Sequence, residues 1–408
     1  MENQCKVTVV DAPCGYGKTS FAIQYMKREI FDSFIFITPF LSELDRVIES
    51  CDNRKFVKPN EKLGEGSKTK HFYKLLEQRK NIVSTHSLFK GITQDIINEI
   101  KEGEYILFLD EVMEVVEDLH ISKDDIQILL NNKTIEVEED GKVRWVNNKY
   151  NGKFTSLKNS CENGDVYLFE NTMILWTFPV NIFKAFKHIY ILTYKFKSQI
   201  QAYYYDMNNV EYEYKSVEFS HTEGFGNLKR DIYELTDYKE INGKEYKDLI
   251  NVYEGKLNNI GDDKYSLSKS WYIKADKKEL MKQLKNNTYN YFRNVAKSKS
   301  KLNMWTTFED FKNSCKGKGY SNGFVACNAR ATNDYKDRTT CVYLCDRYYN
   351  PVIKQFFIDK NVTINEDIWA LSELLQWVFR SAIREHKEIN IYIPSKRMRE
   401  LFKDWIDS

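Results

Sequence analysis

Residues 12–20, APCGYGKTS, combine a glycine-containing loop with a lysine, a threonine and a serine. The apolar run VTVV precedes the loop and an amphipathic stretch follows it, which predicts a strand, a tight loop and a helix. Such a loop directs backbone N–H groups at a phosphate chain, and we expect Lys18 to reach the β and γ phosphates and Thr19 to bind Mg²⁺. An ordinary strand-to-helix turn is the alternative interpretation. The predicted nucleotide-binding residues are Ala12, Pro13, Cys14, Gly15, Tyr16, Gly17, Lys18, Thr19 and Ser20.

Two carboxylates follow the apolar run ILFL within YILFLDEVME. The run predicts a buried central strand that delivers Asp110 and Glu111 to its carboxyl end, beside the phosphate-binding loop. There we expect Asp110 to hold Mg²⁺ through water and Glu111 to polarise an attacking water molecule. A chance Asp-Glu string at a helix start is the alternative. Together with the loop upstream, the pair favours a nucleotide hydrolase over a kinase.

A third stretch with chemical potential is LLQWVFRSAIREHK, in which Gln376, Arg380 and Arg384 recur every four residues. On one α-helix they would share a face, and two cations one turn apart repel each other unless an anion lies nearby. We expect that anion to be a γ phosphate, and the spacing leaves open which arginine contacts it. The alternative is a solvated helix edge on which Arg384 pairs with Glu373 or Glu388.

The elements that must position these residues alternate between strand and helix in the first half of the chain. KVTVV, FIFIT, NIVST and YILFL are each followed by a polar loop or a helix, which predicts a parallel sheet covered on both faces. Alternating residues around Asp140-Gly141 predict a hairpin, inserted at about residues 120–165. MILWTFPV and HIYILTY then return to the α/β pattern. We therefore expect a first lobe at residues 1–205.

A second α/β lobe is expected at residues 206–408, opening with VEYEYKSVEF. Its polar insertion, at about residues 230–300, contains a predicted basic amphipathic helix within KADKKELMKQLKNNTYNYFRNVAKS. KLNMWTTF, NGFVACNARAT, TTCVYLCDRYY and INIYIPS are the expected core strands. The predicted fold class is α/β, with two tandem lobes built on parallel sheets.

Composition limits the classes of partner. The 408 residues include 61 Lys and Arg against 59 Asp and Glu, so a nucleic acid would have to bind a local basic cleft. No window reaches the roughly 18 apolar residues of a membrane span, and the first residues lack the pattern of a secretion signal. We expect a cytoplasmic protein without a membrane partner, whose eight cysteines are reduced and buried.

The order of these stretches resembles the motif series of superfamily 2 helicases. APCGYGKTS, LDEVM and QWVFRSAIR carry the resemblance most specifically, and ITPFLSELDRV, STHSLF, LTY and NARATNDY fit by order and spacing. The resemblance implies two RecA-like P-loop lobes that hydrolyse ATP with Mg²⁺, with Glu111, Gln376, Arg380 and Arg384 in catalysis. LDEVM is similar to the viral origin-binding helicases, and NARATNDY resembles a block of phage-encoded replication proteins. The last motif departs from the family pattern, because Phe379 replaces a glycine and Arg384 comes one residue late.

The resemblance also implies contacts with nucleic acid. By position they would come from Thr38, Pro39, Arg46, Thr85, His86, Asn328, Arg330, Thr332 and Asn333. Thr193 would couple hydrolysis to movement, although TFP at residues 177–179 fits the same motif. The structural alternatives are a strand terminator at Thr38-Pro39, a loop histidine at His86 and pairing of Arg330 with Asp334 or Asp337.

The expected function is an ATP-dependent helicase or translocase acting on nucleic acid, with DNA preferred, during replication of a phage or mobile element in the host cytoplasm. Phage or host replication proteins are further expected partners. Two alternatives use the same ATP site. One is a protein that ATP switches between states of origin or partner binding without unwinding, and the other is an ATPase of host defence or counter-defence.

Overall fold

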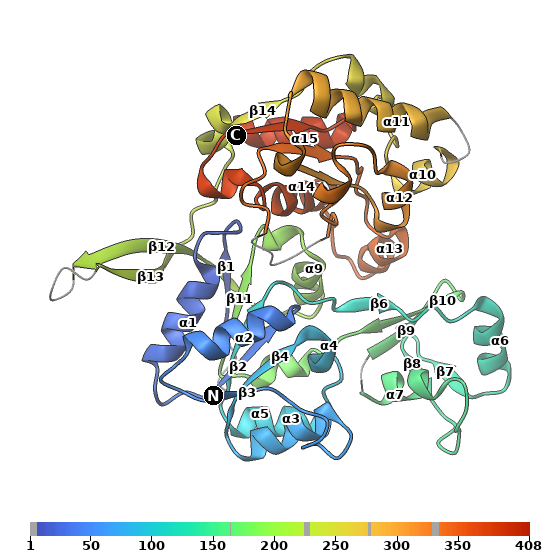
Figure 1. The fold of residues 1–408 in the computed structure, drawn as a ribbon. Helices are drawn as coiled ribbons and strands as arrows, with labels where there is room; N and C mark the ends of the chain where they lie inside the picture. The colour runs from blue at the N-terminus through green and yellow to red at the C-terminus, as the bar shows by residue number, and fades with distance from the viewer. Residues whose placement is uncertain (1–5, 164, 224–228, 276–278, 329–333) are drawn as a thin grey trace. The chain divides into compact units, whose positions relative to one another are not determined.

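The computed structural model describes residues 6–163, 165–223, 229–275, 279–328 and 334–408 (Figure 1). Contacts between residues divide the chain into two compact units. The first comprises Met1–Asp11, Lys18–Tyr238 and Pro351–Ile364, and the second comprises Ala12–Gly17, Lys239–Asn350 and Asn365–Ser408. None of the described helices is long and apolar enough to cross a membrane.

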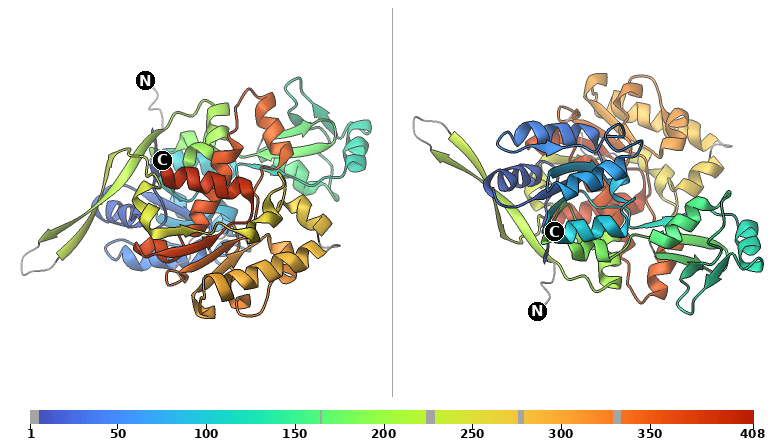
Figure 2. Two further views of the ribbon diagram at one scale, coloured as in Figure 1. Left: turned by 90° about the horizontal axis from the view of Figure 1, so that it is seen from above. Right: turned by 90° about the horizontal axis from the view of Figure 1, so that it is seen from below.

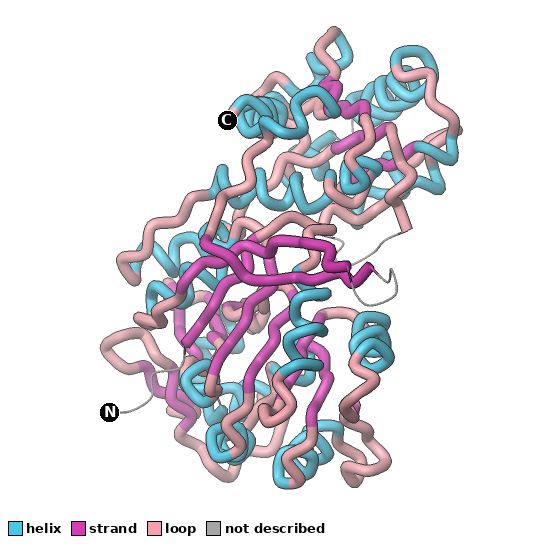
Figure 3. The backbone as a smooth tube through the Cα atoms, turned by 90° about the vertical axis from the view of Figure 1, so that its left-hand side faces the viewer, coloured by secondary structure: helices cyan, strands magenta, loops and turns pink. Residues whose placement is uncertain are grey.

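The first unit is built on an eight-stranded sheet with the order β13-β12-β1-β11-β5-β2-β4-β3 (Figure 3). Each described pair of neighbours is parallel except β12 with β13. Central strands such as FIFIT and ILFLD are buried along their whole length, as expected for a parallel sheet covered on both faces. The strands are β1 (Lys6–Asp11), β2 (Phe34–Thr38), β3 (Phe56–Val57), β4 (Asn81–Thr85), β5 (Ile106–Asp110), β11 (His188–Thr193), β12 (Glu213–Glu223) and β13 (Lys229–Asp237).

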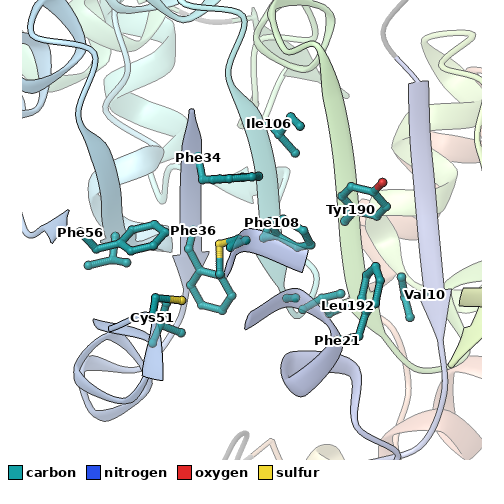
Figure 4. Packing of buried hydrophobic residues seen from close by; sticks show 14 of the residues in the cluster. Val10, Phe21, Phe34, Phe36, Cys51, Phe56, Ile106, Phe108, Tyr190 and Leu192 are labelled. Carbon is teal, nitrogen blue, oxygen red and sulfur yellow. The ribbon is translucent and has the colours of Figure 1, made fainter. Parts of the chain in front are cut away.

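Helices of the first unit cover this sheet, and aromatic side chains fill the space between. Phe108 of β5 stacks on Tyr190 of β11 with ring centroids 4.8 Å apart, and Phe21 of the first helix packs edge-on against both (Figure 4). Offset and edge-on aromatic contacts of this kind add stability beyond their buried area. The helices are α1 (Lys18–Arg28), α2 (Leu41–Ser50), α3 (Lys68–Glu77), α4 (His86–Phe89), α5 (Gln94–Glu102), α8 (Asn181–Ala185), the 3-10 helix η1 (Phe196–Ser198), α9 (Ile200–Met207) and α13 (Pro351–Asp359).

A small module is inserted between β5 and β11. It holds a three-stranded antiparallel sheet, β6-β10-β9, and the hairpin β7-β8, in which Gly141 adopts φ 85° at the predicted turn. MILWT forms β10 of this antiparallel sheet, so its assignment to the parallel pattern was wrong and the insertion runs beyond residue 165. Its elements are β6 (Val116–Asp118), α6 (Lys123–Asn131), β7 (Ile135–Val137), β8 (Val143–Trp145), α7 (Thr155–Asn163), β9 (Asp165–Phe169) and β10 (Met173–Thr177).

Residues 206–238, expected in the second lobe, belong to the first unit. The reason is strand pairing, because β12 lies parallel to β1 from Thr8 opposite Glu213 onward, and β13 pairs with β12 along its length. The two strands form a ribbon that extends past the neighbouring strands of the sheet (Figure 2).

The second unit contains a four-stranded parallel sheet, β14-β17-β16-β15. Its strands are β14 (Ile250–Val252), β15 (Asn303–Thr306), β16 (Thr340–Tyr343) and β17 (Ile389–Tyr392). Its α-helices are α10 (Lys269–Ala275), α11 (Glu279–Asn290), α12 (Lys312–Cys315), α14 (Glu366–Val378) and α15 (Lys396–Asp407). Shorter turns are η2 (Lys244–Leu249), η3 (Lys256–Gly261), the π-helical η4 (Tyr291–Val295), η5 (Ser300–Leu302), η6 (Glu309–Phe311), η7 (Ser321–Gly323) and η8 (Ala382–Glu385).

The core strand expected within residues 322–332 is not formed by its described part. Phe324 makes a single bridge to Trp305, against whose ring it packs edge-on, and Val325 N–H donates to Trp305 O. The backbone then leaves the sheet, and residues 329–333 lie outside the described range. The prediction of an α/β fold with a parallel sheet in each half of the chain is nevertheless confirmed.

Candidate ATP-hydrolysis site

Three adjacent strands of the first unit end at the same edge of its sheet. Asp11, the last residue of β1, lies opposite Thr193 of β11, and Leu192 of β11 lies opposite Asp110 of β5. The expected phosphate-binding loop starts directly after Asp11, and Glu111 directly follows β5. The chain therefore brings the start of the loop, Thr193 and the carboxylate pair together at the carboxyl ends of parallel strands, where α/β proteins bind ligands.

Asp11 connects the end of β1 to the turn after β11. Its carboxylate accepts hydrogen bonds from the backbone N–H groups of Lys195, at 2.8 Å, and Phe196, at 2.9 Å. Lys195 has the left-handed φ of 55° in the turn that supplies these two N–H groups. Burial raises the pKa of Asp11, while the two N–H donors oppose that shift. Asp11 was not among the predicted site residues. A single acidic residue that ends an apolar strand just before a phosphate-binding loop could have indicated it.

Asp110 is buried and held from two sides. Thr38 Oγ1 donates to its Oδ2 at 3.0 Å, and the ring of His86 contacts its carbonyl oxygen through Nε2 at 3.1 Å. Burial and, next, the negative charge of Glu111 raise the pKa of Asp110 to about 7, and the hydrogen bond from Thr38 partly offsets them. Because burial makes the charged form of this carboxyl unfavourable, a bound cation would stabilise it, as in a metal site.

Glu111 has an unusual backbone conformation for a residue with a side chain. Its φ is 66°, its N–H donates to Leu192 O at 3.0 Å, and Thr193 Oγ1 donates to its Oε2 at 3.5 Å. Left-handed conformations at non-glycine residues cost about 1–3 kcal/mol and cluster at functional sites. Thr193 is thus the threonine that reaches the carboxylate pair, whereas Thr177 ends β10 in the separate antiparallel sheet.

Gly15 and Gly17 of the loop have φ values of 97° and 83°, which residues with a side chain rarely adopt. By its contacts the loop Ala12–Gly17 groups with the second unit. There the Tyr16 hydroxyl donates to Glu245 Oε1 at 3.2 Å and also pairs with the Tyr246 hydroxyl. A Cβ atom at Gly15 would come within 2.9 Å of Arg384 Cγ, so both backbone angle and space require glycine.

Lys18 and Thr19 begin α1, directly after the loop, with Lys18 buried and Thr19 partly buried. Thr19, Ser20 and Lys18 therefore occupy the first turn of a helix, where orphan N–H groups and the helix dipole favour an anion.

Gln376, Arg380 and Arg384 do not share one helix, so that prediction was wrong. α14 ends at Val378, Ser381 is extended at φ −76° and ψ −172°, and a separate 3-10 turn begins at Ala382. The Ser381 hydroxyl donates to Val378 O at 2.7 Å and so takes a carbonyl at the helix end, which stops the helix.

Arg380 is 2% exposed, and its Nε and Nη2 atoms have no hydrogen-bond partner within the described part of the chain. Burying a guanidinium whose donors make no hydrogen bond costs free energy of folding, and a bound anion could accept these hydrogen bonds. Glu373 pairs with Arg347 at 2.9 Å and Glu388 accepts from Asn251 at 2.5 Å, so the two glutamates considered as partners of Arg384 have other contacts.

The residues expected to contact nucleic acid lie in different environments. Thr38 and His86 contact Asp110, and Thr85 Oγ1 caps α4 by accepting from Leu88 N–H. Arg46 lies on α2 and pairs with Glu43 at 2.7 Å, and Pro39 directly follows β2 and is half-buried. Asn328 is exposed, and Arg330, Thr332 and Asn333 lie outside the described residues.

The donor set fits Mg²⁺ bound together with a nucleotide. Among the described residues no group of three or more His, Cys, Asp or Glu could hold a metal ion. Magnesium commonly keeps water and phosphate oxygens and takes only one or two protein ligands. In such a site, Thr19 and Asp110 would be the two protein ligands.

Two family profiles, one relative and one solved structure are similar to this chain. A family profile described as the "YonV C-terminal Rossmann-like domain" matches residues 244–406, and one described as the "YonV middle domain" matches residues 116–176, the inserted module. The chain is 43% identical over 418 residues to the "SPbeta prophage-derived uncharacterized protein YonV" of Bacillus subtilis (strain 168), covering 99% of each chain. Among solved structures, that of S. tokodaii Xpd4 aligns with 98% of this chain and 94% of its own at 11% identity, with a TM-score of 0.46.

Proposed function

The chain belongs to the YonV family, and we propose that this member is an ATP-dependent helicase or translocase of the superfamily 2 type, acting on nucleic acid. The observation that carries the proposal is the alignment of Asp11, Thr193 and Asp110 at one sheet edge, with Glu111 strained beside them. Because the relative is prophage-derived, replication of phage or mobile-element DNA is the proposed setting.

In the proposed reaction, Lys18 and the N–H groups at the start of α1 would hold the phosphates, and Thr19 and Asp110 would hold Mg²⁺. The metal ion would offset negative charge on the phosphate oxygens. Glu111 accepts a proton from the water that attacks the γ phosphorus, and the bond from that phosphorus to the β–γ bridging oxygen breaks, releasing ADP and phosphate. Thr193 holds the Glu111 carboxylate through the contact at 3.5 Å.

Arg380 of the second unit supplies the proposed stabilising cation. Its buried Nε and Nη2 groups, unpartnered among the described residues, could both donate to γ-phosphate oxygens. An arginine of this kind stabilises charge in the transition state of phosphoryl transfer and is worth about 10³–10⁵ in turnover. Arg384, which approaches Gly15 of the loop, is the second candidate for the same role.

ATP turnover tests this proposal when measured on the full chain without polymer and with single-stranded DNA, duplex DNA or RNA. We expect stimulation by at least one polymer and a loss of about 10²-fold or more in Lys18→Ala, since that lysine reaches the β and γ phosphates. Unchanged turnover in Lys18→Ala contradicts the site, and no stimulation by any polymer contradicts the motor. Strand displacement on a tailed duplex separates a helicase from a protein that ATP merely switches.

A further inference from the structure

Residues 264–301 carry a strong local excess of positive charge. They contain eleven Lys and Arg against two Asp and Glu, which leaves 50 basic and 57 acidic residues for the rest of the chain. The net charge of +2 therefore hides one basic segment of net charge +9 in an otherwise acidic protein. Nothing in the proposed ATP site uses this segment.

The cations of α11 and of the turn that follows it lie away from the core. One side of α11 and of the π-helical turn η4 is buried through Met281, Leu284, Tyr291 and Phe292, in the hydrophobic cluster that includes Trp305 of β15. On a helix that turns about 100° per residue, Lys282, Lys285, Tyr289 and Arg293 fall within about 80° of one another, beside the buried stripe. Lys282, Tyr289 and Arg293 are exposed and Lys285 is partly buried. α11 lies at the surface of the second unit (Figures 1 and 2).

These cations have few anionic neighbours. Lys282 pairs with Glu279 at 3.3 Å, with both side chains exposed. Within the described residues, no carboxylate comes within ion-pair distance of Lys285, Arg293 or Lys297. The positive potential of this face is therefore not neutralised by the protein itself.

The neighbouring side chains distinguish between polyanions. A membrane-binding amphipathic helix must insert its apolar side into the lipid, but that side of α11 is packed in the core. Tyr289 is 41% exposed and stands four residues after Lys285 and four before Arg293. A tyrosine between cations suits a nucleic-acid strand, since bases stack on aromatic rings while phosphates bind the cations.

We propose that the α11 face binds the phosphate backbone of a single nucleic-acid strand and stacks one base on Tyr289. The α11 face is defined as Lys285, Tyr289 and Arg293 together with Lys297, which is exposed and lies two residues after η4. The partner class follows from the proposed function, but the contact needs neither ATP nor the residues of the ATP site. The α11 face would bind the strand whether the ATP site holds ATP, ADP or no nucleotide, and so would keep the protein bound to the nucleic acid between rounds of hydrolysis.

Binding of a fluorescein-labelled oligo-dT strand tests the proposal, measured by anisotropy with nucleotide-free full chain between 50 and 200 mM NaCl. The logarithm of the binding constant should fall linearly with the logarithm of the salt concentration. We expect the triple variant Lys285→Gln, Arg293→Gln, Lys297→Gln to make this slope shallower by about 2, since each phosphate contact with a single strand contributes about 0.7 to it. Tyr289→Ala should weaken binding by about 5-fold to 100-fold with little change in slope.

The matched control removes three cations from α3 by Lys68→Gln, Lys70→Gln and Lys74→Gln, which pair with Glu61 and Glu65. It has the same net charge as the α11 variant and should bind like wild type. Three results would contradict the proposal for the α11 face. They are a wild-type slope and affinity in the α11 variant, an equal loss of strand affinity in both triple variants, and no strand binding by the wild-type protein. Lys18→Ala should keep its salt slope while losing ATP turnover. A chain that binds the strand through α11 but hydrolyses no ATP would contradict only the proposed function.

Discussion

Thr38 Oγ1 donates a hydrogen bond to Oδ2 of Asp110 at 3.0 Å, across the adjacent strands β2 and β5. The family resemblance implied a contact of Thr38 with nucleic acid, but the side chain is fully buried and faces the carboxylate instead. The bond orients one oxygen of Asp110 and leaves the other for a ligand. Second-sphere hydrogen bonds of this type commonly tune metal affinity by about 10-fold to 100-fold.

Replacing Thr38 by Val should therefore raise the Mg²⁺ concentration needed for half-maximal ATP turnover by about 10-fold. The shape of the side chain is kept, so the thermal midpoint should change little. Thr38→Ser retains the hydroxyl and serves as the control. Equal Mg²⁺ requirements in all three proteins would show that Thr38 does not position Asp110.

The φ of 66° at Glu111 predicts that two substitutions at this position differ in their effect on stability. Glu111→Gly should stabilise the protein by about 1 kcal/mol, because glycine adopts this φ without strain, and should abolish turnover. Glu111→Gln should keep wild-type stability and lower turnover by about 10²-fold to 10⁴-fold through loss of the general base. Urea denaturation and steady-state ATP turnover measure the two properties. A Glu111→Gln enzyme that still turns over ATP at the wild-type rate would remove this residue from the mechanism.

The positions of Lys18, Asp110 and Glu111 could be predicted from the sequence because each is set by a short apolar strand with a strong local pattern. Asp110 ends β5, Glu111 follows it, and Lys18 follows β1 after the loop at residues 12–17. Local patterns also predicted the hairpin at Gly141. They could not predict which sheet a strand joins. MILWT and EYKSVEF both have strand-like patterns. Pairing with β9 and β6 places the first in the small antiparallel sheet of the inserted module, whereas pairing with β1 places the second in the large sheet of the first unit.

The break between Arg380 and Arg384 was missed for a different reason. Apolar residues continue at helical spacing through Ile383, so periodicity alone favours one helix. The helix ends because Ser381 bonds back to Val378 O and Ala382 N–H donates to Arg338 O, a residue far away in sequence. Long-range backbone contacts of this kind leave no trace in a single sequence.

Arg380 and Arg384 should respond differently to substitution. Arg380→Met should leave stability unchanged or raise it by about 1–3 kcal/mol. The reason is that an apolar chain of similar length replaces a buried guanidinium whose Nε and Nη2 have no partner among the described residues. Its ATP turnover should fall by about 10³-fold. Arg384→Met, at a partly buried position, should lower turnover less. A larger turnover loss in Arg384→Met than in Arg380→Met would reverse the assignment of the stabilising arginine.

His188 should make the first unit sensitive to acid. Burial, helped by the charge of Lys6, lowers its pKa to about 4, and the nearby Glu213 only partly offsets this. Its Nε2 lies 3.0 Å from Thr8 Oγ1, which donates in turn to Glu213, and its ring stacks on Tyr190 at 4.2 Å. The neutral ring is therefore the form that the folded protein accommodates.

Between pH 6.5 and about 4 the unfolded chain binds a proton at His188 that the folded chain does not, so stability rises with pH across this window and is lost as pH falls. We expect the free energy of unfolding to drop by about 2 kcal/mol from this residue between pH 7.5 and pH 4.5. Urea denaturation at both pH values should show a smaller drop, by that amount, in His188→Gln. His120→Gln, at an exposed histidine, should behave like wild type. Equal pH dependence in wild type and His188→Gln would mean that another group controls acid unfolding.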